Sequence, residues 1–331
     1  MKFIIVVTFL GVLAVGCRKA ERPDVRKLIH EIKIERLDRE MFEMDILSLD
    51  FTAMRGKYGR YFDTYVGGVL NLGSVTNPDF KRLLSLFITD PVMREVADTV
   101  AGVYPDMHKQ EMQLAQAWAY YAYYFPDRII PQVYAHISGF NQSIVVDSAA
   151  VGISLDNYLG ENCIFYSMLA VPVPMYARKK MTSGDISRDV LSGWLNVEFP
   201  FQPRKNDLIS GMIYQGKIIY ILEKLFPDAS SAWLMGFTTE QEKWCEDNKS
   251  QIWGYLIEND YLFSTQQRLM MKYLNDAPFT SGMPVESPGK AVAWTGYQIV
   301  KKYVEKTEIV PEQLMAEQDY HKILRIAGYR P

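Results

Sequence analysis

The sequence predicts an α+β protein, a single and predominantly helical body that carries a small antiparallel sheet. The 331 residues are 48% hydrophobic and 23% charged, which is ordinary for a globular chain with a large core. Most of the chain repeats apolar residues at helical spacing, in segments bounded by Gly, Pro, Asp, Asn, Ser or Thr. Residues 131–155 differ, because short β-branched runs alternate there with turn residues. With no internal repeat, we expect one domain over residues 29–331.

The N-terminus has the features of an export signal. Lys2 precedes an apolar run over residues 3–15, which is too short to remain as a membrane-spanning helix. Residues 13–17 read LAVGC, the pattern of a bacterial lipobox, so residues 1–16 are expected to be a signal peptide and Cys17 the site of lipid attachment. The alternative is an ordinary secretory signal with a chance cysteine. Arg18, in place of Asp, favours transfer to the outer membrane, where several acyl chains would hold the protein facing the periplasm.

Residues 17–28 are expected to form the lipidated N-terminus and a tether, because they are charged and lack apolar periodicity. The alternation of residues 32–37 then predicts a short strand, and Asp38 is a plausible helix cap.

Helical spacing dominates the rest of the body. The expected helices cover residues 39–58, 78–98, 106–125, 185–197, 207–226, 239–258, 264–275, 290–304 and 311–317. The expected sheet strands cover residues 132–137, 143–146 and 151–155, with turns at 139–142 and 147–148. A dense aromatic run begins at Trp118 and ends at Phe125. We expect it to lie in the core, with an interface as the alternative.

Charge and cysteine content exclude several classes of protein. The net charge is −3 without a basic stripe, which argues against nucleic-acid binding. Cys163 and Cys245 are far apart in the sequence, so they form neither a zinc ribbon nor a redox pair. Two separate buried thiols are favoured over a disulfide.

No local motif for catalysis or cofactor binding is present. His30, His108, His136 and His321 are far apart, and the chain lacks a Walker loop, a G-x-S-x-G turn and a dinucleotide fingerprint. We therefore expect no cofactor. Paired carboxylates near the sheet are one alternative, but acidic residues are also frequent in turns for local hydrogen bonding. They would be Asp147, Asp156 and Glu161.

Several ordered segments resemble one family. They are IERLD at 34–38, YGRYF at 58–62, SGF at 138–140, GISLDNYLG at 152–160, MIYQGK at 212–217, IW at 252–253, SPGK at 287–290, WTGYQIV at 294–300 and the closing GYRP. Together with the lipobox they resemble the gliding-motility lipoprotein GldB family of Bacteroidota over nearly the whole mature chain. That resemblance implies a cell-envelope lipoprotein linked to gliding or its associated secretion machinery, and it implies no enzymatic activity.

The second half is also similar, more distantly, to predicted zinc-dependent peptidases. In those enzymes one helix carries H-E-x-x-H and a later turn carries a glutamate ligand. The corresponding positions here are Arg188, Asp189, Ser192 and Gln215. The resemblance thus implies a degenerate peptidase whose metal ligands are lost. An amphipathic helix with polar outer positions explains residues 186–195 equally well.

The function predicted from the sequence is a non-catalytic lipoprotein that acts as a binding or assembly component with a protein partner in the envelope. An active metallopeptidase or other hydrolase with a non-standard site is the first alternative, with that site assembled from groups such as His108 or His136 and the acidic turns. The second alternative is a structural subunit without a cleft.

Overall fold

The computed structural model describes residues 22–43 and 50–331, and its sheet is mixed. The strands β1 (Ile34–Arg36), β2 (Gln132–His136), β3 (Ile144–Asp147) and β4 (Ala150–Ser154) lie in the order β1-β2-β4-β3. β1, β2 and β4 run parallel, and only β3 is antiparallel to its neighbour. The expected strands are confirmed, but the purely antiparallel pairing is wrong. The hairpin turn at 148–149 places β3 beside β4, and the chain that leaves β2 reaches β4 only after this reversal.

The register of the sheet assigns its two faces to different helices. A Cβ added to Gly193, in α9 (Ile186–Glu198), would lie 2.9 Å from Ile144 Cγ2, so α9 packs closely on the face that Ile144 occupies. A Cβ added to Gly152 would lie 1.8 Å from the hydroxyl of Tyr61. Gly152 pairs with the residue after Ile144, so it faces the opposite side. The helices around Tyr61 therefore cover the second face.

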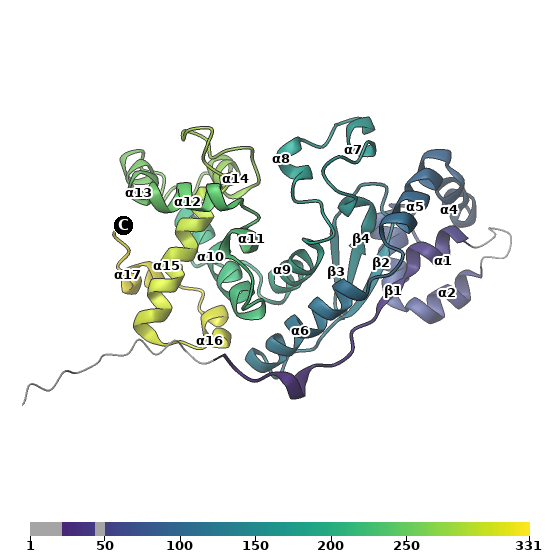
Figure 1. The fold of residues 1–331 in the computed structure, drawn as a ribbon, viewed down its shortest axis with the longest axis horizontal. Coiled ribbons are helices and arrows are strands. Elements are labelled where there is room, and N and C mark those ends of the chain that lie inside the picture. Colours follow the sequence, from purple (N-terminus) through teal and green to yellow (C-terminus); the bar gives the residue numbers. More distant parts are fainter. Residues whose placement is uncertain (1–21, 44–49) are drawn as a thin grey trace, which may run out of the picture.

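The first half of the chain surrounds this sheet (Figure 1). Its other helices are α1 (Leu37–Glu43), α2 (Phe51–Tyr58), α3 (Arg60–Asp63), the π-helical η3 (Thr64–Val69), α4 (Phe80–Thr89), α5 (Pro91–Val103), α6 (His108–Tyr124), α7 (Phe165–Met168) and α8 (Met175–Arg178). The single helix expected over 78–98 is wrong. Asp90 has a non-helical backbone and caps α5, and Pro91 is at the first position of that helix, where proline is tolerated.

The second half is all helical. It contains α10 (Leu208–Leu225), α11 (Ser231–Met235), α12 (Thr239–Asp247), α13 (Lys249–Glu258), α14 (Gln267–Leu274), α15 (Ala291–Thr307), α16 (Pro311–Ala316) and α17 (Tyr320–Ala327). The helix expected over 239–258 is divided at Asn248. α10 and α15 pack against each other through two glycines: a Cβ on Gly216 would lie 2.3 Å from the Gly296 carbonyl carbon. This close crossing explains why both segments contain glycine.

The aromatic run in α6 lies mainly in the core, as predicted. Trp118, Tyr121 and Phe125 are at most 1% exposed, whereas Tyr123 is 50% exposed. The indole N–H of Trp194, in α9, donates to the Tyr121 hydroxyl at 3.1 Å. Through this hydrogen bond and these buried rings, α6 packs against α9.

Residues 22–28, assigned to the tether from the sequence, lie against the body in the structure. Val25 is buried, and the Arg22 guanidinium donates to the carbonyl of Pro227 at 2.7 Å. Cys163 is partly buried and Cys245 is buried, and both are free thiols. In the described ranges no helix is both long enough and apolar enough to cross a membrane.

Candidate functional site

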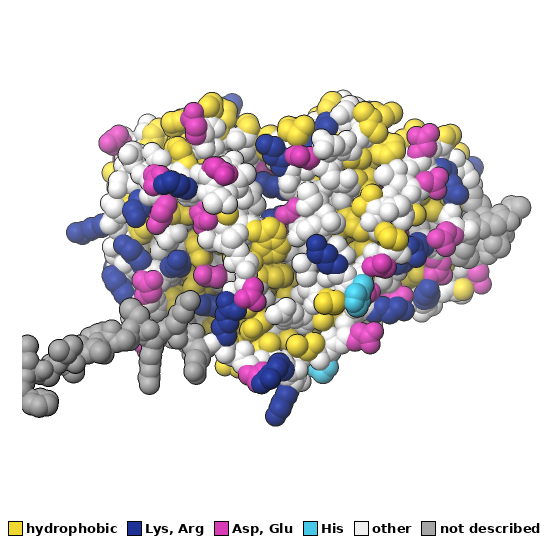
Figure 2. Space-filling view, viewed as in Figure 1, with side chains coloured by type: hydrophobic (Ala, Val, Ile, Leu, Met, Phe, Trp, Pro, Cys, Tyr) yellow, Lys and Arg dark blue, Asp and Glu magenta, His cyan; other side chains and the backbone are white. Residues whose placement is uncertain are grey.

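A cleft separates the sheet-bearing half from the helical half. Its deeper part is a cavity of about 410 Å³, and an adjoining cavity of about 800 Å³ shares Lys180, Arg188, Gly236 and Phe237 with it. In Figure 2 the upper edge of the molecule is hollowed near its middle, and side chains of both charges gather there. Backbone segments from both halves therefore meet around one polar space.

α9 forms one wall of the deeper cavity. Arg188, Ser192 and Asn196 line it at intervals of four residues, so they share one face of the helix. The missing side chain of Gly193 allows α9 to approach β3 closely, and Ser143, just before β3, lines the same cavity. The edge of the sheet thus contributes to this wall.

Arg188 is held in place by several groups. Its guanidinium lies 2.8 Å from Asp185 Oδ1 and 2.9 Å from Asp189 Oδ1, and it donates to the Trp233 carbonyl at 2.8 Å. It also lies over the Trp233 ring, 5.4 Å from the centroid. Since Trp233 belongs to α11 and Arg188 to α9, this cation joins the two halves of the molecule.

Asp189 faces the cavity with its carboxylate already bound. Besides the guanidinium of Arg188, the hydroxyl of Tyr158 donates to Asp189 Oδ2 at 3.0 Å. Burial raises the pKa of Asp189, and the charge of Arg188 opposes that rise. The carboxylate is therefore part of a closed network of hydrogen bonds.

Gln215 enters the cavity from α10, next to the Gly216 crossing. Its amide nitrogen donates to the carbonyl of Leu274 at 2.9 Å, at the end of α14. The side chain thereby ties α10 to the segment that follows α14.

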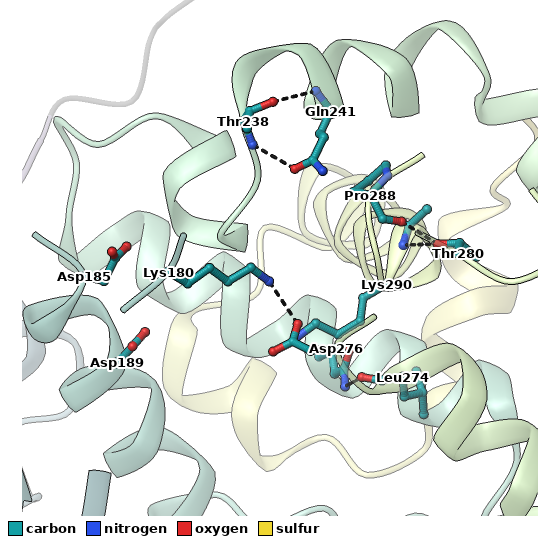
Figure 3. Close-up of polar contacts among 12 residues, drawn as sticks. Lys180, Asp185, Asp189, Thr238, Gln241, Leu274, Asp276, Thr280, Pro288 and Lys290 are labelled. Atoms are coloured by element: carbon teal, nitrogen blue, oxygen red, sulfur yellow. Dashed lines mark hydrogen bonds and ion pairs between the residues drawn. The ribbon is translucent and has the colours of Figure 1, made fainter. Parts of the chain in front are cut away.

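Two ammonium groups and one carboxylate meet in the same cavity: Lys180, which follows α8, reaches toward Asp276 and Lys290 of the helical half. Lys180 Nζ lies 3.0 Å and Lys290 Nζ 2.8 Å from Asp276 Oδ1 (Figure 3). Burial raises the pKa of Asp276, but the two ammonium groups outweigh this effect and hold the pKa at about 2. Asp276 therefore remains ionised at neutral pH.

The four positions identified by the peptidase resemblance meet in one place. Arg188, Asp189, Ser192 and Gln215 all line the deeper cavity. Cys17 lies outside the described residues. Lys180, Asp276 and Lys290 were not singled out from the sequence, although Lys290 ends the SPGK segment that contributes to the family resemblance.

The other candidate residues lie elsewhere. His108 begins α6 and is exposed, while His136 is fully buried in the sheet. Asp156 accepts hydrogen bonds from the backbone N–H groups of Ser138 and Phe140, at 3.0 and 2.6 Å, so it stabilises a turn. Asp147 accepts from Thr64 Oγ1 at 2.7 Å. None of these four side chains lines the cleft.

The side chains at the four positions do not fit a zinc ion. Arg188 brings a permanent positive charge into the centre of the group, and the carboxylate beside it is paired with that charge. Ser192 and Gln215 are neutral where a site of this kind has an imidazole and a carboxylate. Over residues 22–43 and 50–331, no three His, Cys, Asp or Glu side chains are grouped as metal ligands would be.

Comparison with known proteins identifies the family. The family model described as gliding motility protein GldB matches residues 18–331, which include the sheet, the cleft and the helical second half. Searches of the curated proteins and of the solved structures found no match. The family is one of cell-envelope lipoproteins linked to gliding. Because the match extends over nearly the whole chain, this protein belongs to the gliding motility protein GldB family.

Proposed function

We propose that this protein is a non-catalytic lipoprotein, anchored through Cys17 in the outer membrane and facing the periplasm, that binds an extended segment of a protein partner in its cleft. In this role it is an assembly component of the gliding apparatus or of the secretion machinery associated with it. The observation on which the proposal mainly rests is the free edge of β3, a strand that begins directly after Ser143 in the lining of the cleft.

The hydrogen-bonding pattern of β3 defines that edge. Ser154 N–H donates to the Ser143 carbonyl at 3.0 Å, and the register then directs the backbone groups of residues 145 and 147 toward β4 as well. The backbone groups of Ile144 and Val146 point the other way, and among the described residues none pairs with them. An unpaired edge is a template for an added strand.

The position of the edge favours a partner from outside the chain. Ser143 lines the deeper cavity together with Ser192 and Asn196 of α9. A segment paired with β3 would therefore run along the wall that α9 forms, with alternate side chains directed into the cleft.

The chemistry of the cleft favours binding over catalysis. A general base needs a free acceptor within reach of its substrate, whereas the carboxylate of Asp189 is already engaged by Arg188 and Tyr158. The carboxylates of Asp185 and Asp276 are likewise engaged by cationic side chains. We interpret the wall formed by Arg188, Ser192 and Gln215 as the remnant of a metal site.

A pair of variants at one edge position tests strand addition. Val146→Pro removes an N–H that makes no bond to β4, and Val146→Ala keeps that N–H while shortening the side chain. Each variant also carries a photo-cross-linking amino acid at position 143 and is expressed in cells. We expect a discrete cross-linked partner with Val146→Ala and none with Val146→Pro, although the two purified variants should have similar melting temperatures. Equal cross-linking in the two variants would reject strand addition at β3.

Metal content and proteolysis test the non-catalytic part. The purified protein should contain no stoichiometric zinc and should leave an unfolded substrate protein uncut. One zinc per chain together with cleavage of the substrate protein would overturn the proposal that this protein is non-catalytic.

The remnant metal site has a test of its own. The triple change Arg188→His, Ser192→His and Gln215→Glu should create zinc affinity measurable by calorimetry, without activity, since the orienting hydrogen bonds are missing. The control variant has Arg188→His and Ser192→His but keeps Gln215, and it should bind zinc more weakly than the triple variant. No zinc binding by the triple variant would contradict this interpretation.

A further inference from the structure

The cleft contains a pair of lysines arranged around one carboxylate. The ammonium groups of Lys180 and Lys290 both pair with Oδ1 of Asp276, at 3.0 and 2.8 Å. The lysine side chains are 27% and 26% exposed, whereas the Asp276 side chain is 50% exposed. The carboxylate is therefore the most accessible member of the group.

The fold positions both lysines independently of Asp276. The stem of Lys180 lies along Gly236, where an added Cβ would be 3.2 Å from Lys180 Cδ. Lys290 is the N-terminal cap of α15 and has a left-handed backbone, with φ of 61°. The hydroxyl of Thr280 secures this turn, since it donates to the Pro288 carbonyl at 2.7 Å and accepts from the N–H of residue 291 at 2.9 Å (Figure 3).

The charge of this group is positive. Two ammonium groups face one carboxylate, and the N-terminus of the 17-residue helix α15 adds its partial positive charge. The group around Arg188 has the reverse excess, because two carboxylates, Asp185 and Asp189, surround that one cation. Within the cleft, the group with Lys180 and Lys290 is thus the one that favours an additional anion.

We propose that Lys180 and Lys290 form a carboxylate-binding site, which Asp276 occupies in the free protein and yields to a carboxylate of the bound segment. This inference rests on the proposed function and specifies the chemistry of the partner. The carboxylate is either the C-terminus of the partner chain or an acidic side chain, since both present the same two oxygens. Asp276 acts as an internal competitor that keeps the lysines paired while the cleft is empty.

The site lies in the same cavity as Ser143, the residue that precedes β3. Ser143, Lys180, Asp276 and Lys290 all line the same cavity of about 410 Å³. A strand paired with β3 would therefore present an end or a side chain to the two ammonium groups.

Peptide binding to an Asp276 variant tests the site. Asp276→Asn keeps the shape of the side chain and removes its charge, so the lysines become available. Three fluorescent alanine-rich pentapeptides are compared by anisotropy at low salt, with the detergent-solubilised full-length protein. The first has a free C-terminus, the second has a C-terminal amide, and the third has the amide and one internal Glu.

We expect Asp276→Asn to bind a carboxylate peptide at least about tenfold more tightly than the wild type, which corresponds to about 1.4 kcal/mol. Tight binding of the first peptide alone identifies a C-terminus as the ligand, and tight binding of the third identifies an acidic side chain. The second peptide, which has a C-terminal amide and no Glu, should bind weakly. Equal affinity for all three peptides would overturn the proposal.

Matched variants separate the site from general charge effects. Lys180→Met added to Asp276→Asn should abolish the gain. In the wild type, Lys243 Nζ lies 2.7 Å from Asp247 Oδ2 on the surface of α12. Asp247→Asn removes the charge of that carboxylate in the same way, and it should produce no gain in affinity for the carboxylate peptides. An equal gain in either control would refute the site. Val146→Pro added to Asp276→Asn should still bind the carboxylate of a short peptide, so failure of strand addition and failure of the lysine site are distinguishable.

Discussion

At the scale of single residues, His136 is the buried polar group whose contacts define its protonation state. The hydroxyl of Ser154 donates to the Gln142 carbonyl, so it accepts from His136 Nε2, at 2.7 Å. Nδ1 is then the acceptor for the hydroxyl of Tyr61, at 2.6 Å. A second proton on the ring would face the Tyr61 hydroxyl in a site without solvent. Burial accordingly lowers the pKa of His136 to about 3.

This lowered pKa predicts acid sensitivity. The imidazole of the unfolded chain binds a proton near pH 6.5, but the folded protein does not until about pH 3. Between these values the unfolded state holds more protons, so stability falls as the pH falls, by up to about 1.4 kcal/mol per pH unit. Urea unfolding at pH 7 and pH 5 measures the loss. His136→Gln should reduce the difference, and exposed His108→Gln should leave it unchanged. The same difference in all three proteins would contradict the assignment.

At the scale of helices, the crossing of α10 and α15 depends on backbone contact between them. A Cβ on Gly296 would lie 1.9 Å from the Met212 carbonyl oxygen and 3.2 Å from the amide nitrogen of Ile213. These obstacles are backbone atoms, which move only if a whole helix moves. Since Gln215 and Lys290 belong to the same pair of helices, the crossing also positions part of the cleft.

Gly296→Ala should therefore destabilise the protein despite the higher helix propensity of alanine. We expect a loss of at least about 3 kcal/mol, at the upper end of the usual cost of overpacking. Gly254→Ala is the matched control, because the nearest atom to its Cβ would be 4.0 Å away in α13. Gly254→Ala should raise the free energy of unfolding by up to about 1 kcal/mol, because alanine has the higher helix propensity. Denaturant unfolding of both variants measures these effects, and similar stabilities would disprove the crossing.

The buried side of α6 leads to a second prediction at this scale. Trp118 packs edge-on against Tyr121 and Trp194, with ring centroids 5.2 and 6.2 Å apart. Trp118→Ala should cost roughly 3–5 kcal/mol through the cavity it creates. Tyr123→Ala, on the exposed side of the same helix, should cost much less. Unchanged thermal stability of Trp118→Ala would place this face of α6 outside the core.

At the scale of the whole molecule, the cleft and the start of the described chain lie on different sides. In Figure 2 the hollow opens at the upper edge of the molecule, whereas in the same view of Figure 1 the purple start of the ribbon lies at the lower edge. That start is Arg22, which contacts the Pro227 carbonyl. Five residues separate this point from Cys17, a reach of at most roughly 18 Å. An anchored molecule would thus be held by the side opposite its cleft.

Cys17→Ala should release the protein from membranes, because no other segment of the sequence is apolar over a spanning length. Fractionation of cells expressing the two forms measures this release. The control is Cys163→Ala, which should remain in the membrane fraction. Firm membrane association of Cys17→Ala would show that the anchor is not, or not only, at the lipobox.

Local chemistry made much of this fold predictable from the sequence. The main helices and all four strands follow from apolar periodicity and turn residues, which depend on neighbours within a few positions. Asp90 and Pro91 show where this fails, since helical periodicity continues across a break that a cap and a proline create. The positions of α9 and α10 that meet in the cleft were found through a family resemblance rather than through periodicity.

What the sequence by itself determined is therefore the four strands, most of the longer helices and, through the resemblance, the four positions on α9 and α10. The tertiary structure alone decided the parallel pairing of β1, β2 and β4, because these strands are joined by long connections whose direction has no local signature. It alone also decided the contact of Lys180 with Asp276, which are 96 positions apart. Such a contact depends on how α8, α14 and α15 pack around one core, and no local pattern of residues encodes that packing.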